Sequence, residues 1–339
     1  MEPEIQRLLL SDRELRLRGG SDLAERAHVL LRRQKETWPL LRAGYEGLSG
    51  VLTRSIEMDG FAVRVQRNPA RIVSSSANVD PESIGRRRCF LCPANLPAEQ
   101  RGILFAGSYL VLCNPYPIFE EHFTIAHTSH TPQRIGPSFG TMLDLARAME
   151  KRYTLIYNGP KCGASAPDHL HFQAGEKGFL PLEKEIAGLL AGGEVLSRSE
   201  TIQVVAVDAG ERRYISLRSP ERDSLIGALR VVEAAVAGET GEKDEPMMNI
   251  LAWFDRGGWT VLIFPRAKHR PSVYFAQGEE RILISPAAVD CGGVLIAPLE
   301  KDYRRLRADH VSAMFGEIFL SGVSFRNLCS TIAGNLRPV

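Results

Sequence analysis

The spacing of hydrophobic and polar positions predicts short strands and amphipathic helices along the first half of the chain. Leucines at helical spacing among dense charges predict a helical segment over residues 1–48. Apolar and polar residues alternate over 61–66, which is typical of a half-buried strand, and the apolar runs 109–113, 123–126 and 153–157 predict further strands. The first half therefore combines a helical start with a sheet.

The segments between these strands carry their own signals. Ser138 is placed to cap a helix over 139–152, whose apolar positions keep to one face. The polar stretch 68–88 ends in a basic run and predicts a loop. After the strand at 153–157 comes a loop punctuated by Gly and Pro, and then a short strand over 169–174.

A shift in composition near 192–200 predicts a boundary that divides the chain into 1–195 and 196–339. Each half has a strand followed within a few residues by a histidine, in FTIAHTSH and VLIFPRAKH, and this weak echo is what two related halves would show. The second half is predicted to contain a strand at 203–207, a helix at 223–237, and strands at 249–254 and 259–264 that are joined by a hairpin turn at 255–258.

Composition narrows the classes of protein that fit. The 339 residues are 44% hydrophobic and 24% charged, with a net charge of +2, so charge-driven binding to nucleic acid or to a membrane surface is not favoured. No apolar run approaches the roughly 18 residues of a membrane span, and the N-terminus has no signal-peptide core. Six cysteines are too sparse for a disulfide scaffold. We therefore expect a cytoplasmic protein with reduced thiols.

The segment NGPKCGASAPDHLHFQ is richest in candidate chemistry. Its first part is a loop of glycines and small residues, including Gly159, that can bring backbone N–H donors to phosphate oxygens, and Lys161 adds a charge. His169, His171 and Gln173 follow at alternate positions, so a strand would present all three on one face. The plain alternative is a solvated strand face. The adjoining loop favours a site where a histidine attacks phosphorus.

A second feature is the close pair Cys89 and Cys92. Such a pair serves in redox centres or as half of a zinc site. Pro93 follows directly, and the next residues suggest a knuckle turn rather than the helix of a thioredoxin-like centre. A zinc site needs two more ligands, for which the candidates are His122, His127, His130, His169 and His171.

The basic run PRAKHRP follows the second strand of the predicted hairpin. Arg266 and Lys268 in this run are either part of a solvated loop or a phosphate site for an acceptor or a polyphosphate tail.

These motifs together resemble a known group of proteins. CFLCPANLP, a strand that ends in Asn-Pro, the later His130, and N-G…G-A-S-x-P-x-H-x-H-x-Q resemble the galactose-1-phosphate uridylyltransferase branch of the histidine-triad superfamily. The G-A-S loop is also similar to diadenosine tetraphosphate phosphorylases, and DHLHFQ is similar to the NHLHFQ of GDP-hexose phosphorylases. The resemblance covers about 88–174. It implies an α+β fold of two histidine-triad-like halves, with mostly antiparallel sheets and flanking helices.

The resemblance also implies roles for single residues. His171 would be the nucleophile, and Gln173 would contact the transferred phosphate. A structural zinc would be held by Cys89, Cys92, His130 and His169, with His122 as the weaker alternative for the third ligand. Leu91 would line the base pocket, Asn114 would meet the ribose, and Asn158 and Ser165 would belong to the phosphate loop. Asp168 departs from the pattern, because the uridylyltransferases have proline there; it is a loop residue or a hydrogen-bond acceptor for His169.

The predicted function is nucleotidyl transfer through a covalent nucleotidyl-histidine. The first choice is a phosphorylase of an NDP-hexose or a dinucleoside polyphosphate, with phosphate or a sugar phosphate as acceptor. The alternatives are a hexose-1-phosphate nucleotidyltransferase, a zinc-stabilised nucleotide-binding protein without turnover, and a redox protein that uses Cys89 and Cys92. The second half has no H-x-H motif, so one catalytic site per chain is expected. We expect no nucleic-acid or membrane partner, and a homodimer is compatible with the sequence.

Overall fold

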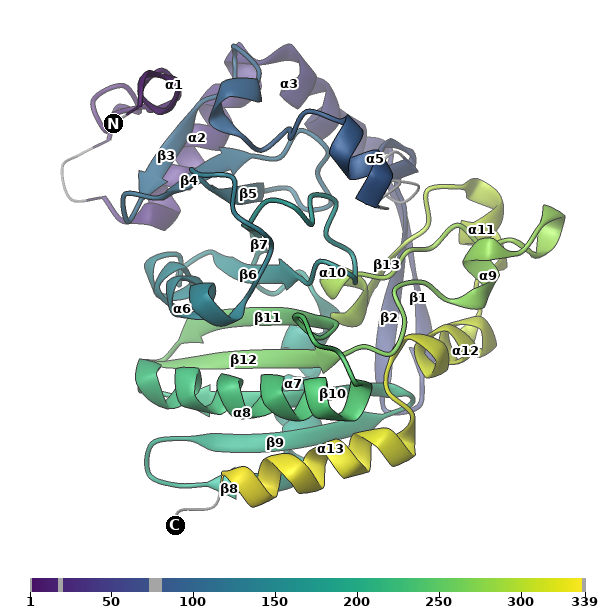
Figure 1. Ribbon diagram of the computed structural model, residues 1–339. Coiled ribbons are helices and arrows are strands. Elements are labelled where there is room, and N and C mark those ends of the chain that lie inside the picture. The colour runs from purple at the N-terminus through teal and green to yellow at the C-terminus, as the bar shows by residue number, and fades with distance from the viewer. Residues whose placement is uncertain (1, 18–20, 73–80, 337–339) are drawn as a thin grey trace.

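One continuous antiparallel sheet of ten strands runs through the computed structural model, which describes residues 2–17, 21–72 and 81–336 (Figure 1). With the helices on its faces it confirms the predicted α+β class. In the order of the sheet the strands are β3 (Gly102–Phe105), β4 (Tyr109–Cys113), β5 (His122–His127), β7 (His171–Glu176), β6 (Tyr153–Asn158), β11 (Met248–Asp255), β12 (Gly258–Pro265), β10 (Arg212–Ser219), β9 (Gln203–Ala209) and β8 (Glu194–Arg198).

The sheet consists of two halves with the same strand order. The first half is β3-β4-β5-β7-β6 and the second is β8-β9-β10-β12-β11, so that β6 and β11 meet in the middle, with Ile156 opposite Leu251. Each half has one long crossover helix before its last hairpin, α6 (Phe139–Ala148) in the first and α8 (Arg222–Thr240) in the second. This repeat is what two related halves would produce. The boundary at 195 lies within β8 and stays a prediction.

The two sequence segments that echoed one another do not occupy equivalent strands. FTIAHTSH belongs to β5, which corresponds to β10 in the repeat, whereas VLIFPRAKH belongs to β12, which corresponds to β7.

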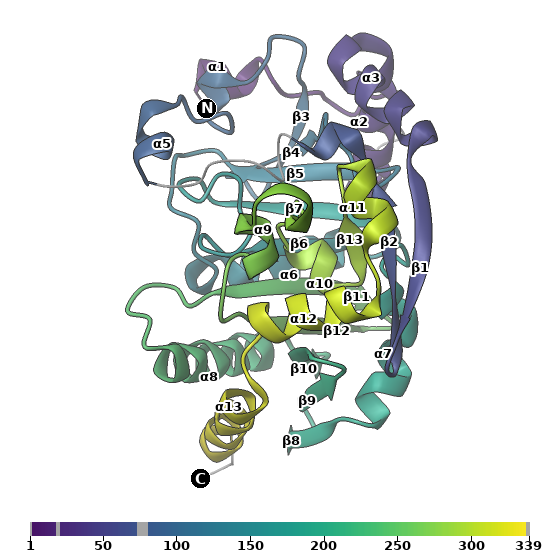
Figure 2. The ribbon, with the colours of Figure 1, turned by 90° about the vertical axis from the view of Figure 1, so that its right-hand side faces the viewer.

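Different elements cover the two faces of the sheet. Residues of α2, α6, α8 and α13 pack with one face in the largest apolar cluster. The opposite face of the second half packs with α7, α12 and a small sheet of β1, β2 and β13, and Figure 2 shows α8 and α13 on one side of the strands and α7 with β1 and β2 on the other. The remaining bounds are α1 (Pro3–Gln6), α2 (Leu23–Thr37), α3 (Pro39–Glu46), α5 (Pro81–Arg86), α7 (Pro181–Ala191), α9 (Ser272–Phe275), α10 (Ala288–Cys291), α11 (Glu300–Arg305), α12 (Ala308–Ile318), α13 (Gly322–Asn335), β1 (Leu52–Met58), β2 (Phe61–Arg67) and β13 (Val294–Ile296).

Most predicted strands lie within a residue or two of the observed ones, and one difference matters for the site. β7 begins at His171, so His169 precedes the strand instead of sharing its face. The predicted helix over 1–48 is three shorter helices, with Pro39 opening the third. The predicted loop at 68–88 contains α5, although 73–80 lie outside the described residues.

The structure corrects one further local prediction and confirms another. Ser138 stands at the start of α6, but its side chain makes no capping hydrogen bond, which corrects the predicted cap. The hairpin turn between β11 and β12 is confirmed: Arg256 and Gly257 both have positive φ angles, of 50° and 83°, as a type I′ turn requires. None of the helices in the described ranges has the length and apolar character needed to cross a bilayer.

Candidate functional site

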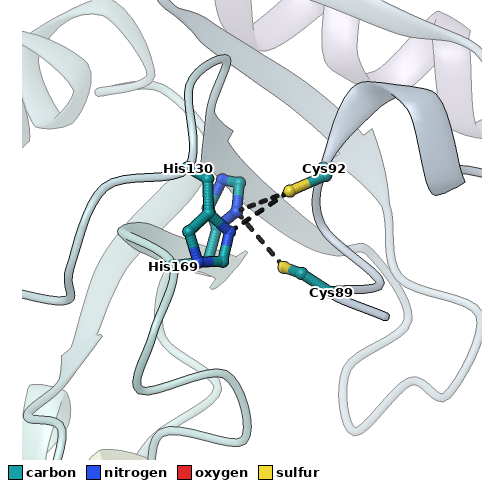
Figure 3. A group of neighbouring side chains, drawn as sticks. All are labelled: Cys89, Cys92, His130 and His169. Carbon is teal, nitrogen blue, oxygen red and sulfur yellow. Dashed lines mark hydrogen bonds between the residues drawn. The ribbon is translucent and has the colours of Figure 1, made fainter. Parts of the chain in front are cut away.

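Four side chains from three segments meet at one end of the first half of the sheet (Figure 3). Their donor atoms all lie within 4.8 Å of one another. Sγ of Cys89 is 3.3 Å from Nδ1 of His169, and Sγ of Cys92 is 3.2 Å from Nδ1 of His130 and 3.6 Å from Nδ1 of His169. Tetrahedral zinc with ordinary bond lengths sets sulfur and nitrogen ligands about 3.5 Å apart. The set therefore fits a tetrahedral metal ion.

The ring of His169 is oriented so that Nδ1, the atom that could bind a metal ion, faces the sulfurs of Cys89 and Cys92. Its Nε2 donates to the carbonyl of His127 at 2.8 Å, which leaves the lone pair of Nδ1 pointing at the cluster. Burial and the neighbouring Cys89 raise the pKa of the Cys92 thiol to about 11. A bound cation would reverse that shift, since thiolates are the ligands. Asp168 is not the hydrogen-bond acceptor of His169, whose Nε2 donates to His127; a carboxylate oxygen of Asp168 lies 3.7 Å from Nε2 of His130 instead.

A cavity of about 480 Å³ adjoins this cluster. Its lining is partly apolar and partly polar, and the polar part includes His171 and Gln173 of β7. The apolar lining residues are Trp38, Leu40, Phe90, Leu91, Leu96, Pro97, Leu112, Cys113, Pro115 and Tyr116, and the polar ones are Arg71, Arg87, Gln100, Asn114, Thr124, Ser165, His171 and Gln173. A pocket with an apolar part and a few convergent polar groups is the usual form of a small-molecule site.

His171 is one of the polar residues that line this cavity. Nδ1 of its ring lies 2.8 Å from the carbonyl oxygen of His169, so Nδ1 carries the proton and donates it to that carbonyl. Nε2 then holds the lone pair, and it has no bonding partner in the described part of the chain. Burial lowers the pKa of His171 to about 4, which keeps the ring neutral near pH 7. The geometry presents one uncommitted imidazole nitrogen at a cavity wall.

Gln173 is oriented by His122, which is fully buried. The N–H of Ile118 donates to Nδ1 of His122 at 3.3 Å, so Nε2 carries the hydrogen and donates to Oε1 of Gln173 at 2.9 Å. The NH₂ group of Gln173 then has no partner among the described residues. His122 is thus engaged with Gln173, and it lies outside the metal cluster. The alternative ligand assignment therefore has no geometric support.

A second, smaller cavity of about 70 Å³ shares Arg71, Ser165 and Gln173 with the first. The second half of the chain supplies much of its wall through the segment after β12, including His269 and Arg270. Its other walls are Ile118, Asn158, Gly163, Ala164, Ser285, Ala287, Val289, Asp290 and Ile296. Burial lowers the pKa of His269 to about 4 and raises that of Asp290 to about 6. Two arginines and a loop of small residues therefore surround a space of the size of a phosphate group.

Four of the predicted substrate residues line these cavities. Leu91, Asn114 and Ser165 line the larger one, and Ser165 and Asn158 line the smaller one. Asn158 is already engaged, because its Oδ1 accepts hydrogen bonds from Asn249 at 2.9 Å and from the N–H of Ala288 at 2.8 Å. Its side chain thus fastens the loop to the second half.

The other predicted substrate residues lie away from both cavities. Gly159 packs against Met248, where a side chain would come within 2.8 Å of the Met248 carbonyl oxygen. Lys161 is exposed and pairs with Glu242 at 2.7 Å. Lys268 is exposed and pairs with Glu317 at 3.1 Å.

Arg266 is fully buried, and this corrects its interpretation as a phosphate ligand. Its guanidinium donates to Asn249 and to the carbonyls of Ile318, Pro286, Lys268 and His269, at 3.0 to 3.2 Å for the carbonyls. These hydrogen bonds leave the guanidinium no donor for a phosphate. Of the run PRAKHRP, His269 and Arg270 line the smaller cavity instead.

Several cavity residues were not predicted. Arg71 lines both cavities, and Arg87 lines the larger one and contacts Asp168 at 3.3 Å. Both come from the polar stretch that was predicted to be a loop. Arginines in such a stretch give no signal in the sequence, because their neighbours in space, such as Tyr116 and Ser165, are far away along the chain.

Comparison with known proteins bears on the fold. Residues 30–176 match the family model described as Domain of unknown function (DUF4922), which covers less than half of the chain and ends with β7. The matched region contains the whole metal cluster and His171. A search of curated proteins finds no significant match.

Solved structures extend the comparison over most of the chain. The yeast Ap4A phosphorylase Apa2 in complex with AMP has a TM-score of 0.52 and 15% identity, over 86% of this chain and 97% of that one. The same enzyme in complex with Ap4A has a TM-score of 0.51 and 13% identity, over 84% and 97%. A uridylyltransferase mutant matches with a TM-score of 0.42 and 10% identity, over 75% and 94%, too low to establish a shared fold. The predicted resemblance is confirmed at the level of the fold.

Proposed function

We propose that the protein is a nucleotidyltransferase of the phosphorylase type, acting on a nucleoside diphosphate compound through a covalent nucleotidyl-histidine. The observation that carries the proposal is His171. Its ring is neutral, its tautomer is fixed by the carbonyl of His169, and its free Nε2 borders a cavity of a size that suits a nucleotide. The fold shared with an Ap4A phosphorylase supports the same class of reaction.

The reaction has two successive displacements at the same α-phosphorus. In the first, the lone pair of Nε2 of His171 attacks the α-phosphorus, the P–O bond to the remainder of the donor breaks, and that oxygen leaves with the bonding electrons. The hydrogen bond from Nδ1 to the carbonyl of His169 stabilises the positive charge that the ring gains. In the second, an acceptor oxygen attacks the same phosphorus and Nε2 leaves with its electron pair, which restores the enzyme.

The charge that builds on the phosphoryl oxygens meets donors from two directions. The NH₂ group of Gln173 is held by His122 on the same face of the sheet as His171. The backbone of the loop at Gly163 to Ser165 borders the small cavity beside it. Fixed donors of this kind stabilise a transition state without the cost of reorganisation.

The two cavities suggest how the donor is placed. The apolar lining of the large cavity, which includes Leu91, suits a nucleoside. The small cavity, with Arg71 and Arg270 in its wall, suits the phosphate that follows the α-phosphate, or an acceptor phosphate that replaces it. This arrangement favours phosphorolysis over transfer to a hexose phosphate, because the small cavity has room for a phosphate but not for a sugar.

We assign a structural zinc to Cys89, Cys92, His130 and His169. Four protein ligands leave no open position, so the ion would serve structure and not catalysis. It would hold together the turn around Cys92, the segment after β5 that carries His130, and the approach to β7 that carries His169. That places the carbonyl of His169 where the ring of His171 needs it.

The test is covalent trapping. The protein is incubated with an α-³²P-labelled nucleotide donor without acceptor, quenched in base, and the labelled residue is located by mass spectrometry. We expect an acid-labile, base-stable label on His171, which is released when phosphate is added. His310→Ala, on α12, is the control that should label normally. Turnover of the donor by a protein that never carries label would refute the double displacement.

The acceptor is tested with the same protein. Phosphate and a panel of hexose 1-phosphates are compared for release of the label, and the donors are dinucleoside polyphosphates and NDP-hexoses. Release by hexose 1-phosphates at rates that phosphate does not match would replace the phosphorylase with a hexose-1-phosphate nucleotidyltransferase.

A further inference from the structure

The side chain of Gln133 occupies a rung of the ladder between β6 and β7. The two strands pair as far as Ile156 and Gln173, and the same register would next bond Asn158 to His171. The side chain of Gln133 makes the hydrogen bonds of that position in place of the two backbones. Its Oε1 accepts the N–H of His171 at 2.8 Å, and its Nε2 donates to the carbonyls of His171 and of Asn158, at 3.0 Å each.

The amide of Gln133 thereby imitates a peptide group at one residue of the sheet. It offers one acceptor and two donors, and it satisfies both backbone groups of His171 on the β6 side. On the other side, His171 is paired with Ala126 of β5. His171 is the first residue of β7, where a strand otherwise frays, so these bonds fix a backbone position that the ladder alone leaves open.

The segment that carries Gln133 also carries a member of the metal cluster. His130 stands three residues earlier, and the backbone between them is bonded to the approach to β7. The N–H of Leu170 donates to the carbonyl of Thr131 at 2.6 Å, and the N–H of Gln133 donates to that of Pro167 at 3.3 Å. The segment from His130 to Gln133 is therefore joined to the approach to β7 at His169 through the metal-binding cluster and at His171 through the amide of Gln133.

We propose that Gln133 is a positioning residue for His171, which sets the backbone from which the imidazole projects. The proposal rests on the proposed function, since it assigns a purpose to the position of His171. The hydrogen bond from Nδ1 of His171 to the carbonyl of His169 spans only two residues, so it forms only when the backbone between them is held. A displacement of about 1 Å at a reacting group costs on the order of 100-fold in rate.

The test variant is Gln133→Met, which keeps the length of the side chain and removes all three bonds. Gln34→Met is the matched control. Gln34 is equally buried and also makes three bonds: its Nε2 donates to the carbonyl of Glu99 at 3.1 Å and to the hydroxyl of Thr37 at 3.2 Å, and its Oε1 accepts the N–H of Arg101 at 2.8 Å. The two variants lose equal numbers of buried hydrogen bonds at different places.

We expect Gln133→Met to form the covalent label about 100-fold more slowly, with the KM for the donor within threefold of the wild type and the zinc content unchanged. Gln34→Met should lose comparable stability and label at the normal rate. Gln133→Glu, which retains the acceptor for His171 but neither donor, should fall between them. A Gln133→Met protein that labels within threefold of the wild type would overturn the proposal, as would an equal loss in Gln34→Met.

A second readout separates this proposal from the proposed function. Amide hydrogen exchange, followed by mass spectrometry over the peptide that contains His171, needs no substrate. Exchange at His171 should be at least 10-fold faster in Gln133→Met than in the wild type and in Gln34→Met. If the wild type never labels, the proposed function fails and exchange alone decides: faster exchange supports the positioning role, and unchanged exchange refutes it.

Discussion

His169 and His171 are separated by one residue, and different carbonyl groups direct their rings to different tasks. The carbonyl of His127 takes the Nε2–H of His169, which turns Nδ1 toward the two sulfurs. The carbonyl of His169 takes the Nδ1–H of His171, which leaves Nε2 at the cavity. A ring bound to a metal has no lone pair left for attack, so in the proposed mechanism His169 would hold the ion and His171 would attack.

Alanine substitutions should separate the two roles. His171→Ala should retain the fold and the metal, because His171 lies outside the cluster, and should lose turnover by about three orders of magnitude or more, because no other described side chain replaces Nε2. His169→Ala should lose metal, thermal stability and activity together. Metal analysis, thermal unfolding and the labelling rate of each variant check this. Metal loss in His171→Ala would contradict the assignment.

The buried His122 makes a prediction about pH. Burial lowers its pKa to about 3, so the folded protein keeps it neutral while the unfolded chain, with a pKa near 6.5, gains a proton as the pH falls. Unfolding is therefore favoured by acid through this group. Between pH 7 and pH 5 it should cost the wild type about 2 kcal/mol of unfolding free energy that His122→Phe does not lose.

Urea denaturation of the wild type and of His122→Phe at pH 7 and pH 5 measures the effect of that group, because the other titrating residues are common to both proteins and cancel. The stability difference between the two proteins at pH 7 should shrink or reverse at pH 5. A difference that is the same at both pH values would show that His122 is protonated in the folded state.

At the scale of elements, the metal cluster joins three segments that share no strand ladder at that point. The cluster brings together the turn around Cys92, the segment after β5 and the approach to β7. The same segments are also joined by the backbone bond from Leu170 to Thr131 and by the contact between Arg87 and Asp168. Loops held by a bound ion would depend on it, because without the ion the thiolates repel one another or become protonated.

Metal removal should therefore weaken the site before the sheet. Cys89→Ser, or treatment with a strong chelator, should lower the zinc content and the melting temperature and should slow labelling, while far-UV circular dichroism keeps the signal of the sheet. Cys329→Ser is the control, since Cys329 is buried on α13, outside the cluster and outside the walls of both cavities. Full activity in a protein shown to hold no metal would refute a role for the ion.

The segment after β12 makes a prediction about the acceptor. Arg270 lines the small cavity, whereas Lys268, two residues earlier, pairs with Glu317 on the outside. Arg270→Ala should raise the KM for phosphate about 10-fold and leave donor binding within twofold, because one charge-assisted contact is lost. Lys268→Ala should change neither. Equal effects of both substitutions would indicate a general electrostatic contribution rather than a site.

Element patterns were predictable where the information is local. The strand β4 and the hairpin between β11 and β12 follow from alternation and turn residues near one another in sequence. β1 was missed because most of its residues are exposed, and β13 because three residues pair in parallel with β2 from across the chain. Arg266 was misread because its partner Ile318 is distant in sequence. Side-chain partners across a fold carry no local signal.

At the scale of the whole molecule, a symmetric sheet carries an asymmetric site. The two halves repeat the same strand order, yet the cysteine pair and the H-x-H motif occur only in the first. The second half contributes His269, Arg270 and Asp290 to the small cavity and fastens the loop of Asn158 through Asn249. The second half of the chain thus supplies part of the wall of the small cavity and holds the loop at Asn158 in place.

This asymmetry predicts the stoichiometry of the protein. Each chain should bind one zinc ion and accept one nucleotidyl label, because its eight histidines include a single pair in which one ring faces two thiols and the next faces a cavity. Metal analysis and intact-mass spectrometry after labelling without acceptor measure both numbers on the same sample. His171→Ala should keep the first number at one and take the second to zero. A second label that survives in this variant would place another nucleophile in the chain, and the second half would then hold a site of its own.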